Sequence, residues 1–386
     1  MAYVDRQTSL RPKGCWLMST FRLSLLPASD GDCMILSWGE VGQLHHMIID
    51  GGRTSAYSEL SDRLSLIVQE GGSLDLYVLT HIDGDHIGGA LSYLRDEHRP
   101  IAPEAVWFNG YREIKGGGRR SMKQGDDYSS LLRTLEWPLN DQFETGVVTV
   151  ETDPGDIDIA GLRIRILSPY ASNLEALATR WDELRKLKEQ EEELARRDAN
   201  GRRGARKEKT PIPSPIVLDD LIADGETDTE VPNGSSIAFV AEWSGRRVLL
   251  TGDAHPDVLV RSLGPLAVAE GGRYAVDLLK APHHGSRKNT SRPLIEVLDC
   301  RNMAISTNGI IHGHPDPQSI ARFLHYGGEG AKSLHFNYAT PRTLPWGSAE
   351  TQSRYDYVAN YPDDEAPGVI EIDLLAMPGR TTDRGE

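Results

Sequence analysis

One short stretch of the sequence, residues 76–90, constrains the fold and the function of this chain more than any other. Residues 76–79 are apolar and predict a buried strand, and potential metal ligands follow it closely: His81, Asp83, Asp85 and His86. Gly88 and Gly89 then allow close packing where a loop turns into a helix. A hydrated acidic turn with two incidental histidines is the alternative interpretation. The gathering of four ligand-type side chains and two glycines at one strand end favours a metal site.

Imidazole and carboxylate ligands together suit zinc, with manganese and iron as harder competitors. The ligands alternate along residues 81–85, so that one turn can serve two ions. The pattern therefore predicts a dinuclear hydrolytic site that binds one or two ions, Zn²⁺ or Mn²⁺.

Residues 80–89, Thr-His-Ile-Asp-Gly-Asp-His-Ile-Gly-Gly, resemble the His-x-His-x-Asp-His signature of the metallo-β-lactamase superfamily. The resemblance is strongest to the variant with Asp at the second position, which is typical of the hydrolase domain of ComEC-type DNA-uptake proteins and their soluble relatives. Asp83 stands where most members have histidine. This departure implies that the first metal site has a harder ligand set, with a carboxylate in place of an imidazole.

Further matches follow in the order of the family. Residues 50–52 (Asp-Gly-Gly) resemble the end of the family's third strand, and residues 233–236 (Asn-Gly-Ser-Ser) resemble a segment in which many other members place a third histidine ligand. The resemblance implies that Asp253, at the end of a strand, bridges two metals. In residues 276–286, one of His283 and His284 is then expected to complete the second site with Asp85, His86 and Asp253. His284 is the favoured of the two, and the first site is left with His81, Asp83 and Asp253.

Other roles follow from these motifs. Asp50 is expected to orient the ligand loop by hydrogen bonds rather than to bind metal. Asp83 and Asp85 are also candidates to take up the proton of the attacking water. Lys280 is either a residue that steadies an anion or a lysine that snorkels from its strand. His314, in a loop resembling the family's Gly-His-Pro loop, is expected to face the substrate or act as an outer ligand.

The composition limits the partners. The formal net charge is −15, so the chain repels polyanions on average, although a basic groove can still bind one. Its three cysteines are too few and too scattered for a disulfide framework or a thiolate zinc site, which fits a reducing compartment. The first ten residues lack the apolar region of a secretory signal, and no apolar run is long enough to span a membrane. A cytoplasmic location without membrane contact is expected.

The strand and helix patterns divide the chain into three parts. Residues 1–170 and 232–386 read as two halves of one domain, and the resemblance implies the α/β fold of a four-layer αββα metallo-β-lactamase sandwich. Residues 171–231 read as an insertion. This insertion begins with an amphipathic helix, continues into basic, Pro-rich and acidic segments and is expected to be partly disordered in its middle. We expect the insertion to be dispensable for folding, so that a short Gly-Ser linker can replace residues 196–230. Residues 111–125 read as an exposed loop, with a phosphate-binding lid as the alternative.

The expected activity is metal-dependent hydrolysis. A phosphodiesterase or nuclease acting on a small-molecule or nucleic-acid phosphodiester is favoured by the resemblance and by basic runs at residues 115–120 and 202–209. A small ester or lactone hydrolase is one alternative. A non-catalytic binding module, with a protein partner at residues 171–231, is another. The sequence has neither a Walker-type phosphate loop nor a Gly-x-Ser-x-Gly elbow.

Overall fold

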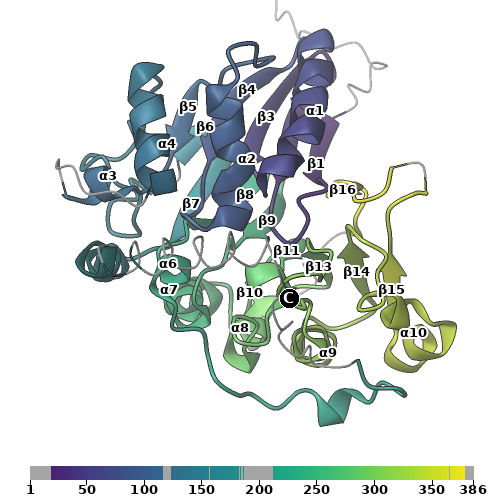
Figure 1. The fold of residues 1–386 in the computed structure, drawn as a ribbon. Helices are drawn as coiled ribbons and strands as arrows, with labels where there is room; N and C mark the ends of the chain where they lie inside the picture. The colour runs from purple at the N-terminus through teal and green to yellow at the C-terminus, as the bar shows by residue number, and fades with distance from the viewer. Residues whose placement is uncertain are drawn as a thin grey trace, which may run out of the picture.

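The first sheet carries the strand that leads into residues 81–86. The computed structural model describes residues 19–115, 123–155, 157–181, 183, 186, 212–364 and 366–378. Within these ranges the first sheet has the order β16-β1-β2-β3-β4-β5 (Figure 1). Its strands are β1 (Ser19–Leu25), β2 (Met34–Glu40), β3 (Gln43–Ile49), β4 (Ser73–Val78), β5 (Ala105–Trp107) and β16 (Ile370–Asp373). Strands β16, β1, β2 and β3 pair antiparallel, whereas β3, β4 and β5 run parallel.

The second sheet carries most of the C-terminal half. In the described part of the chain its order is β15-β14-β13-β11-β9-β8-β7-β6. Its strands are β6 (Ile157–Ile159), β7 (Leu162–Ser168), β8 (Ala238–Trp243), β9 (Arg246–Leu250), β11 (Leu278–Lys280), β13 (Asn302–Ile305), β14 (Lys332–Phe336) and β15 (Tyr357–Asn360). From β9 to β15 the neighbouring strands are parallel, so their carboxyl ends lie at one edge. A short parallel pair, β10 (Tyr274–Ala275) with β12 (Leu298–Asp299), lies apart from both sheets.

Helices cover the outer face of each sheet. The helices α1 (Tyr57–Gln69), α2 (Gly84–Arg95) and α4 (Lys123–Thr134) lie against the first sheet, as Figure 1 shows. The second sheet is covered by α7 (Pro256–Ala269), α8 (Arg292–Glu296) and α9 (Pro317–Tyr326). Shorter helices are α3 (Tyr111–Lys115), α6 (Val231–Gly234) and α10 (Ala349–Tyr355). No helix of the described residues is long and apolar enough to cross a membrane.

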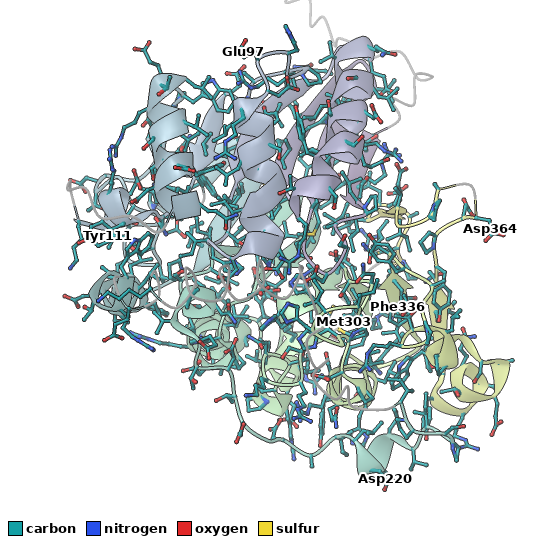
Figure 2. All side chains as sticks on the ribbon, viewed as in Figure 1. Glu97, Tyr111, Asp220, Met303, Phe336 and Asp364 are labelled. Atoms are coloured by element: carbon teal, nitrogen blue, oxygen red, sulfur yellow. The ribbon has the colours of Figure 1, made fainter. Side chains whose placement is uncertain are left out.

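Three buried clusters hold these layers together. Leu36 of the first sheet and Phe239 of the second share the cluster between the sheets. Leu64 of α1 packs with Tyr77 on the outer face of the first sheet. Met303 and Phe336 belong to the cluster beneath α7, α8 and α9, and Figure 2 shows both among the strands of the second sheet. Apolar side chains on both faces of each sheet therefore produce the expected four layers, αββα.

One expectation changes where the chain is locally polar. Residues 111–125 are not a continuous loop, because α3 occupies residues 111–115 and α4 starts at Lys123; residues 116–122 lie outside the described residues. Helix α4 was not predicted, because its sequence is mostly polar and its buried apolar side chains are chiefly Tyr128 and Leu132.

The predicted insertion, residues 171–231, packs against the sandwich at both ends. Leu177 and Trp181 enter the core under the first sheet, and Ile216 and Leu218 enter the core under the second. The basic run at residues 202–209 lies outside the described residues. The boundaries of the three parts stay a prediction.

Candidate metal centre

The loop after β4 is held by close backbone contacts. Residue Asp83 precedes α2 in extended conformation, and its carbonyl accepts hydrogen bonds from the amides of His86 and Ile87, both at 2.9 Å. A methyl group at Gly89 would lie 2.0 Å from the carbonyl oxygen of Gly51, which no side chain tolerates. These glycines therefore let the start of α2 approach the loop that follows β3, and they fix where the side chains of residues 81–86 point.

Asp253, just after β9, lies at the centre of the site. Its Oδ2 is 3.8 Å from Nε2 of His81, 3.5 Å from Nε2 of His86 and 3.6 Å from Nε2 of His283. Its Oδ1 is 3.7 Å from Nε2 of His284, which in turn lies 3.6 Å from Asp85. Asp83 is 3.7 Å from His81. We call this group the Asp253 cluster: His81, Asp83, Asp85, His86, Asp253, His283 and His284.

Several atoms of the Asp253 cluster are buried without any hydrogen-bond partner. They are Nε2 of His81, Nε2 of His86, Nε2 of His284 and Oδ1 of Asp253. Leaving a buried polar atom unpaired costs about 1–3 kcal/mol. Ligand atoms about 2.0–2.1 Å from a tetrahedral ion lie about 3.4 Å from each other, and the N···O separations of 3.5–3.8 Å are close to that. The donor set and its spacing therefore fit a bound divalent cation.

The Nδ1 atoms of these imidazoles have partners of their own. Nδ1 of His86 is 2.7 Å from Asp50, whose carboxylate also accepts from the amide and hydroxyl of Thr80. Nδ1 of His284 is 3.0 Å from the carbonyl oxygen of Ser306 and 3.3 Å from Asp32. Because Nδ1 is engaged, the free Nε2 atoms turn toward Asp253. Partners of this kind fix the tautomer and orientation of histidine ligands.

Residue His283 is held in the same way from another direction. Its Nδ1 lies 3.1 Å from Oδ1 of Asn289 and 3.4 Å from Asp228. The amides of Asn289 and Asn233 both donate to Asp228, at 2.9 and 2.7 Å. His283 and His284 are both in the left-handed region, with φ of 48° and 55°. The structure thus brings both histidines of residues 283–284 to Asp253, where the sequence left the choice open.

The electrostatics of the cluster follow from burial and mutual contact. Burial works to raise the pKa of Asp253, but His283, His86 and His284 outweigh it and hold that pKa well below its usual range. Burial lowers the pKa of His284, yet Asp32, Asp253 and Asp85 together raise it to about 10. Burial also works to lower the pKa of His86 and His283, but contact with the carboxylates outweighs it and raises both, and a cation bound by these rings would release their protons.

Lys280 lies behind the cluster rather than at its open side. Its ammonium is fully buried and is 2.5 Å from Asp32 and 3.0 Å from the carbonyl oxygen of Ala281. These contacts favour a role in holding Asp32 beside His284 over direct contact with a substrate anion.

The loop after β13 brings two more histidines to the site. The ring of His314 lies 5.3 Å from that of His283, and its Nδ1 is buried and lacks a hydrogen bond. Burial lowers the pKa of His314 to about 4, against the opposing effect of Asp316, so the ring is neutral at pH 7. His312 is more exposed and lies 3.4 Å from Asp30. His314 is therefore placed beside the cluster without facing Asp253 directly.

Sequence reasoning missed three residues that support the imidazoles: Asp32, Asp228 and Asn289. Asp32 ends the turn Ala-Ser-Asp-Gly-Asp of residues 28–32, which resembles a turn found at this place in the family and was given no role in the site. Asp228 lies in the acidic segment that was read as part of the insertion, and Asn289 lies three residues after the motif at 276–286, so neither position indicated a role beside His283.

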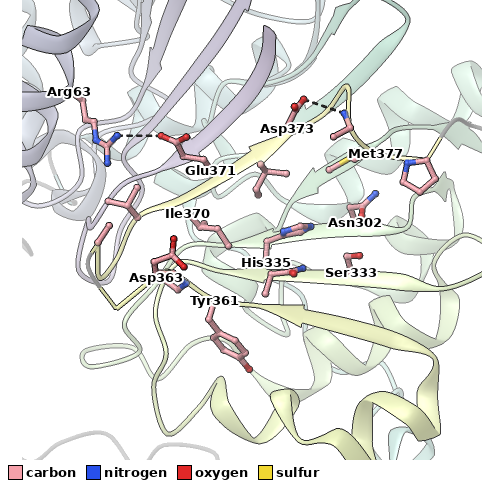
Figure 3. A pocket seen from close by; sticks show the side chains of 17 residues that line it. Arg63, Asn302, Ser333, His335, Tyr361, Asp363, Ile370, Glu371, Asp373 and Met377 are labelled. Carbon is pink, nitrogen blue, oxygen red and sulfur yellow. Dashed lines mark hydrogen bonds and ion pairs between the residues drawn. The ribbon is translucent and has the colours of Figure 1, made fainter.

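A cavity of about 700 Å³ lies elsewhere (Figure 3). It is lined by the starts of β13 and β14, including Asn302 and Ser333, and by β16 and Arg63. None of its lining residues belongs to the Asp253 cluster. The cluster instead lies beyond the carboxyl ends of β4, β9 and β11, where ligands bind in open parallel sheets.

Two sheets between helices, with histidines and carboxylates gathered at the strand ends, define an αββα protein with a candidate metal centre. The sequence profile described as "Metallo-beta-lactamase superfamily" matches residues 40–309, and the chain belongs to this superfamily. No curated protein matches the chain by sequence.

Several solved structures resemble the chain. The metallo-beta-lactamase fold protein YhfI from Bacillus subtilis is 10% identical, with a TM-score of 0.38, over 92% of this chain and 100% of that one. A long form RNase Z from yeast is 12% identical, with a TM-score of 0.38, over 95% of this chain and 43% of that one. Zn(2+)-bound PqqB from Methylobacterium extorquens is 11% identical, with a TM-score of 0.36, over 91% of this chain and 99% of that one.

Proposed function

We propose that this protein is a metal-dependent hydrolase and that its substrate is a phosphodiester, as in a nuclease or a nucleotide phosphodiesterase. The Asp253 cluster carries the proposal. Its side chains come from separate strand ends and aim buried, unpaired nitrogen and oxygen atoms at one another. Folding alone gives no reason to bury these atoms unpaired, whereas cation binding does.

The residues would divide between two ions, with Asp253 shared by both. His81, Asp83 and His283 would hold one ion, and Asp85, His86 and His284 the other. We infer Zn²⁺, with Mn²⁺ as the alternative because carboxylates make the set harder. A bound pair of divalent cations lowers the pKa of water from 15.7 to about 7 and stabilises the oxygens of an in-line displacement. Asp83, whose side chain is 28% exposed, would take up a proton from the attacking water.

The choice of a phosphodiester rests on the resemblance of residues 80–89 and 276–286 to the ComEC-type hydrolases. The net charge of −15 favours a short or nucleotide-sized substrate over long duplex DNA, because the molecule repels polyanions on average. A protein partner at residues 171–231 and a cytoplasmic location stay predictions.

Metal content is the first test. Protein purified without chelator should contain one to two equivalents of zinc or manganese by mass spectrometry. The double variant Asp85→Ala with His86→Ala should lose the tighter ion, because it removes two ligands of one set. The exposed Asp299→Asn on β12 is the matched control and should keep the full content. Unchanged stoichiometry in the double variant would show that the ligands are wrongly assigned.

Turnover is the second test. Metal-loaded protein should hydrolyse bis-p-nitrophenyl phosphate, oligonucleotides or cyclic dinucleotides, with Asp253→Asn and His284→Ala each lowering kcat/KM by about 100-fold or more. Esters and lactones are run in parallel with each metal. Turnover of the esters alone would make the protein an ester hydrolase. Turnover of nothing by fully loaded protein would favour a binding module.

A further inference from the structure

We propose that Arg53 binds the substrate anion, donating from Nη1 to a non-bridging phosphate oxygen of the phosphodiester. This inference deepens the proposed function and rests on it. Arg53 follows the Gly51–Gly52 turn after β3, and its side chain is 35% exposed. It therefore combines a fixed backbone position with access to solvent.

Two of the three guanidinium nitrogens of Arg53 are committed to one carboxylate. Its Nε donates to Oδ1 of Asp30 at 2.8 Å, and its Nη2 donates to Oδ2 at 2.5 Å. Asp30 is buried, with 1% of its side chain exposed, so it serves as a rigid base for the fork. Nη1 makes no hydrogen bond with a described residue, and one edge of the guanidinium is left for a ligand.

The Nη1 edge of Arg53 lies beside the loop of residues 81–86. A methyl group built on Gly84 would be 3.6 Å from Nη1 of Arg53, and Gly84 stands between Asp83 and Asp85. The hydrogen bonds to Asp30, followed by the charges of Asp30, Asp85 and Asp83, raise the pKa of Arg53. A permanently charged donor thus lies beside Gly84, the residue between two aspartates of the Asp253 cluster.

The same contacts argue against a third cation site at this point. Ligand atoms of Asp30, Asp85 and His312 lie within 4.8 Å of one another. Both oxygens of Asp30 already face the guanidinium, whose positive charge compensates the carboxylate. The arrangement suits an anion that approaches Nη1 better than a cation that would meet Arg53.

The chemistry of phosphodiester hydrolysis gives this residue a task. Charge on the non-bridging oxygens must be neutralised by preorganised donors, and a guanidinium fork holds such oxygens with directional hydrogen bonds. A neutral ester has no anionic oxygen in its ground state, so Arg53 should discriminate between the two substrate classes. A purely structural role, in which the Arg53–Asp30 pair only ties two loops together, predicts no such discrimination.

The kinetic experiment compares Arg53→Met and Arg53→Lys with the control Arg63→Met. Arg63 pairs with Glu59 and Glu371 and lines the cavity outside the Asp253 cluster. Arg63→Met therefore removes one positive charge, as Arg53→Met does, but away from the cluster. Arg53→Met should lower kcat/KM for bis-p-nitrophenyl phosphate by about 100-fold and leave p-nitrophenyl acetate hydrolysis and metal content within about twofold of the unmodified protein. Arg53→Lys should recover part of the loss, and Arg63→Met should show none. Retention of phosphodiester turnover in Arg53→Met, or an equal loss on both substrates, would overturn the inference.

Equilibrium binding separates this inference from the proposed function. Inorganic phosphate is titrated into the zinc-loaded protein by calorimetry. Arg53→Met should weaken phosphate binding by about tenfold, and Arg63→Met should not change it. One outcome is that the unmodified protein cleaves no phosphodiester, while Arg53→Met binds phosphate more weakly than the unmodified protein does. In that case the proposed function fails and the anion site stands. Equal phosphate affinity in both variants would refute the anion site whatever the kinetics.

Discussion

Three of the four imidazoles whose Nε2 faces Asp253 have a carboxylate beside Nδ1; the fourth, His81, has the hydroxyl of Thr80 there. Asp50 lies behind His86, Asp32 behind His284 and Asp228 behind His283. A carboxylate in this position fixes the ring and increases the basicity of its free nitrogen, and its removal costs about 10–100-fold in metal affinity or activity. The repeated pairing argues that His283 acts as a fourth imidazole of the Asp253 cluster, beside His81, His86 and His284. It would occupy the place that residues 233–236 leave without a histidine.

The pairing predicts the effect of removing Asp228. Asp228→Ala should lower zinc affinity by about 10–100-fold, because His283 loses a partner at Nδ1 and can rotate away. Asp228→Asn, which keeps the shape, should lose less. The measurement is competition with a chelating dye. The control is Asp224→Asn, in the same segment, where the carboxylate contacts Arg322 and the amide of Arg292 instead. Equal zinc affinity in all three variants would mean that His283 binds no metal.

At the scale of elements, residues 212–231 belong to the sandwich more than their sequence indicates. Ile216, Leu218 and Leu221 are buried in the core beneath the second sheet. The guanidinium of Arg322 on α9 donates to the backbone carbonyls of Ile222 and Ala223. These contacts argue against the expectation that all of residues 196–230 are dispensable.

A pair of replacements tests this division. Replacing residues 187–211 by a short Gly-Ser linker should leave a folded, metal-loaded protein. Extending the replacement to residue 230 should abolish soluble expression or metal loading, because each buried aliphatic side chain contributes about 1.5–3 kcal/mol and Asp228 is lost as well. Solubility, circular dichroism and metal content decide the outcome. If the protein with the longer replacement folds and binds metal normally, residues 187–230 are dispensable, as expected for an insertion.

Strand β14 offers a pH-dependent element away from the Asp253 cluster. Burial lowers the pKa of His335 to about 4, and its Nε2 is buried without a hydrogen bond beside the cavity in Figure 3. The unfolded chain takes up this proton near pH 6.5 and the folded protein only near pH 4. The stability contribution is therefore full above pH 6.5 and is lost as the pH falls toward 4.

Urea unfolding of metal-free protein measures this loss. The free energy of unfolding should fall by about 2 kcal/mol more between pH 6.5 and 4 in the unmodified protein than in His335→Gln, since about 1.4 kcal/mol corresponds to one pKa unit. His325→Gln on α9, where the side chain is 41% exposed, is the control and should behave like the unmodified protein. Identical pH profiles for all three proteins would exclude a contribution from His335.

The elements that could be predicted from sequence are those whose pattern is local. The strands at residues 21–26 and 162–167 alternate in polarity, and residues 59–70 carry apolar side chains at helical spacing, so β1, β7 and α1 can be predicted from sequence because this periodicity reflects one buried face. Helix α7 was not predicted, and Pro265 lies inside it. In the same way residues 81–86 and 283–284 were recognisable as contiguous ligand motifs. Asp228 and Arg53 were not, because their contacts depend on segments distant in the chain.

At the scale of the whole molecule, the Asp253 cluster joins the two halves. Residues 81–86 follow a strand of the first sheet, whereas Asp253, His283 and His284 follow strands of the second. Metal ligands from both sheets would cross-link the sandwich at one edge. Three imidazole nitrogens and a carboxylate oxygen are buried there without partners, so the metal-free state carries an unfavourable contribution at the junction of the sheets.

The stability of the whole fold should therefore depend on metal. An ion that binds the native state alone stabilises it by about 4 kcal/mol when its free concentration is 1,000 times Kd. Removal of metal by a chelator should lower Tm by several degrees, and zinc added back in excess should restore it. Asp253→Asn should show little response to either treatment, because it lacks the shared carboxylate; Asp299→Asn should respond like the unmodified protein. A Tm that is insensitive to chelator in fully loaded protein would mean that the ions do not link the two sheets, even if they support catalysis.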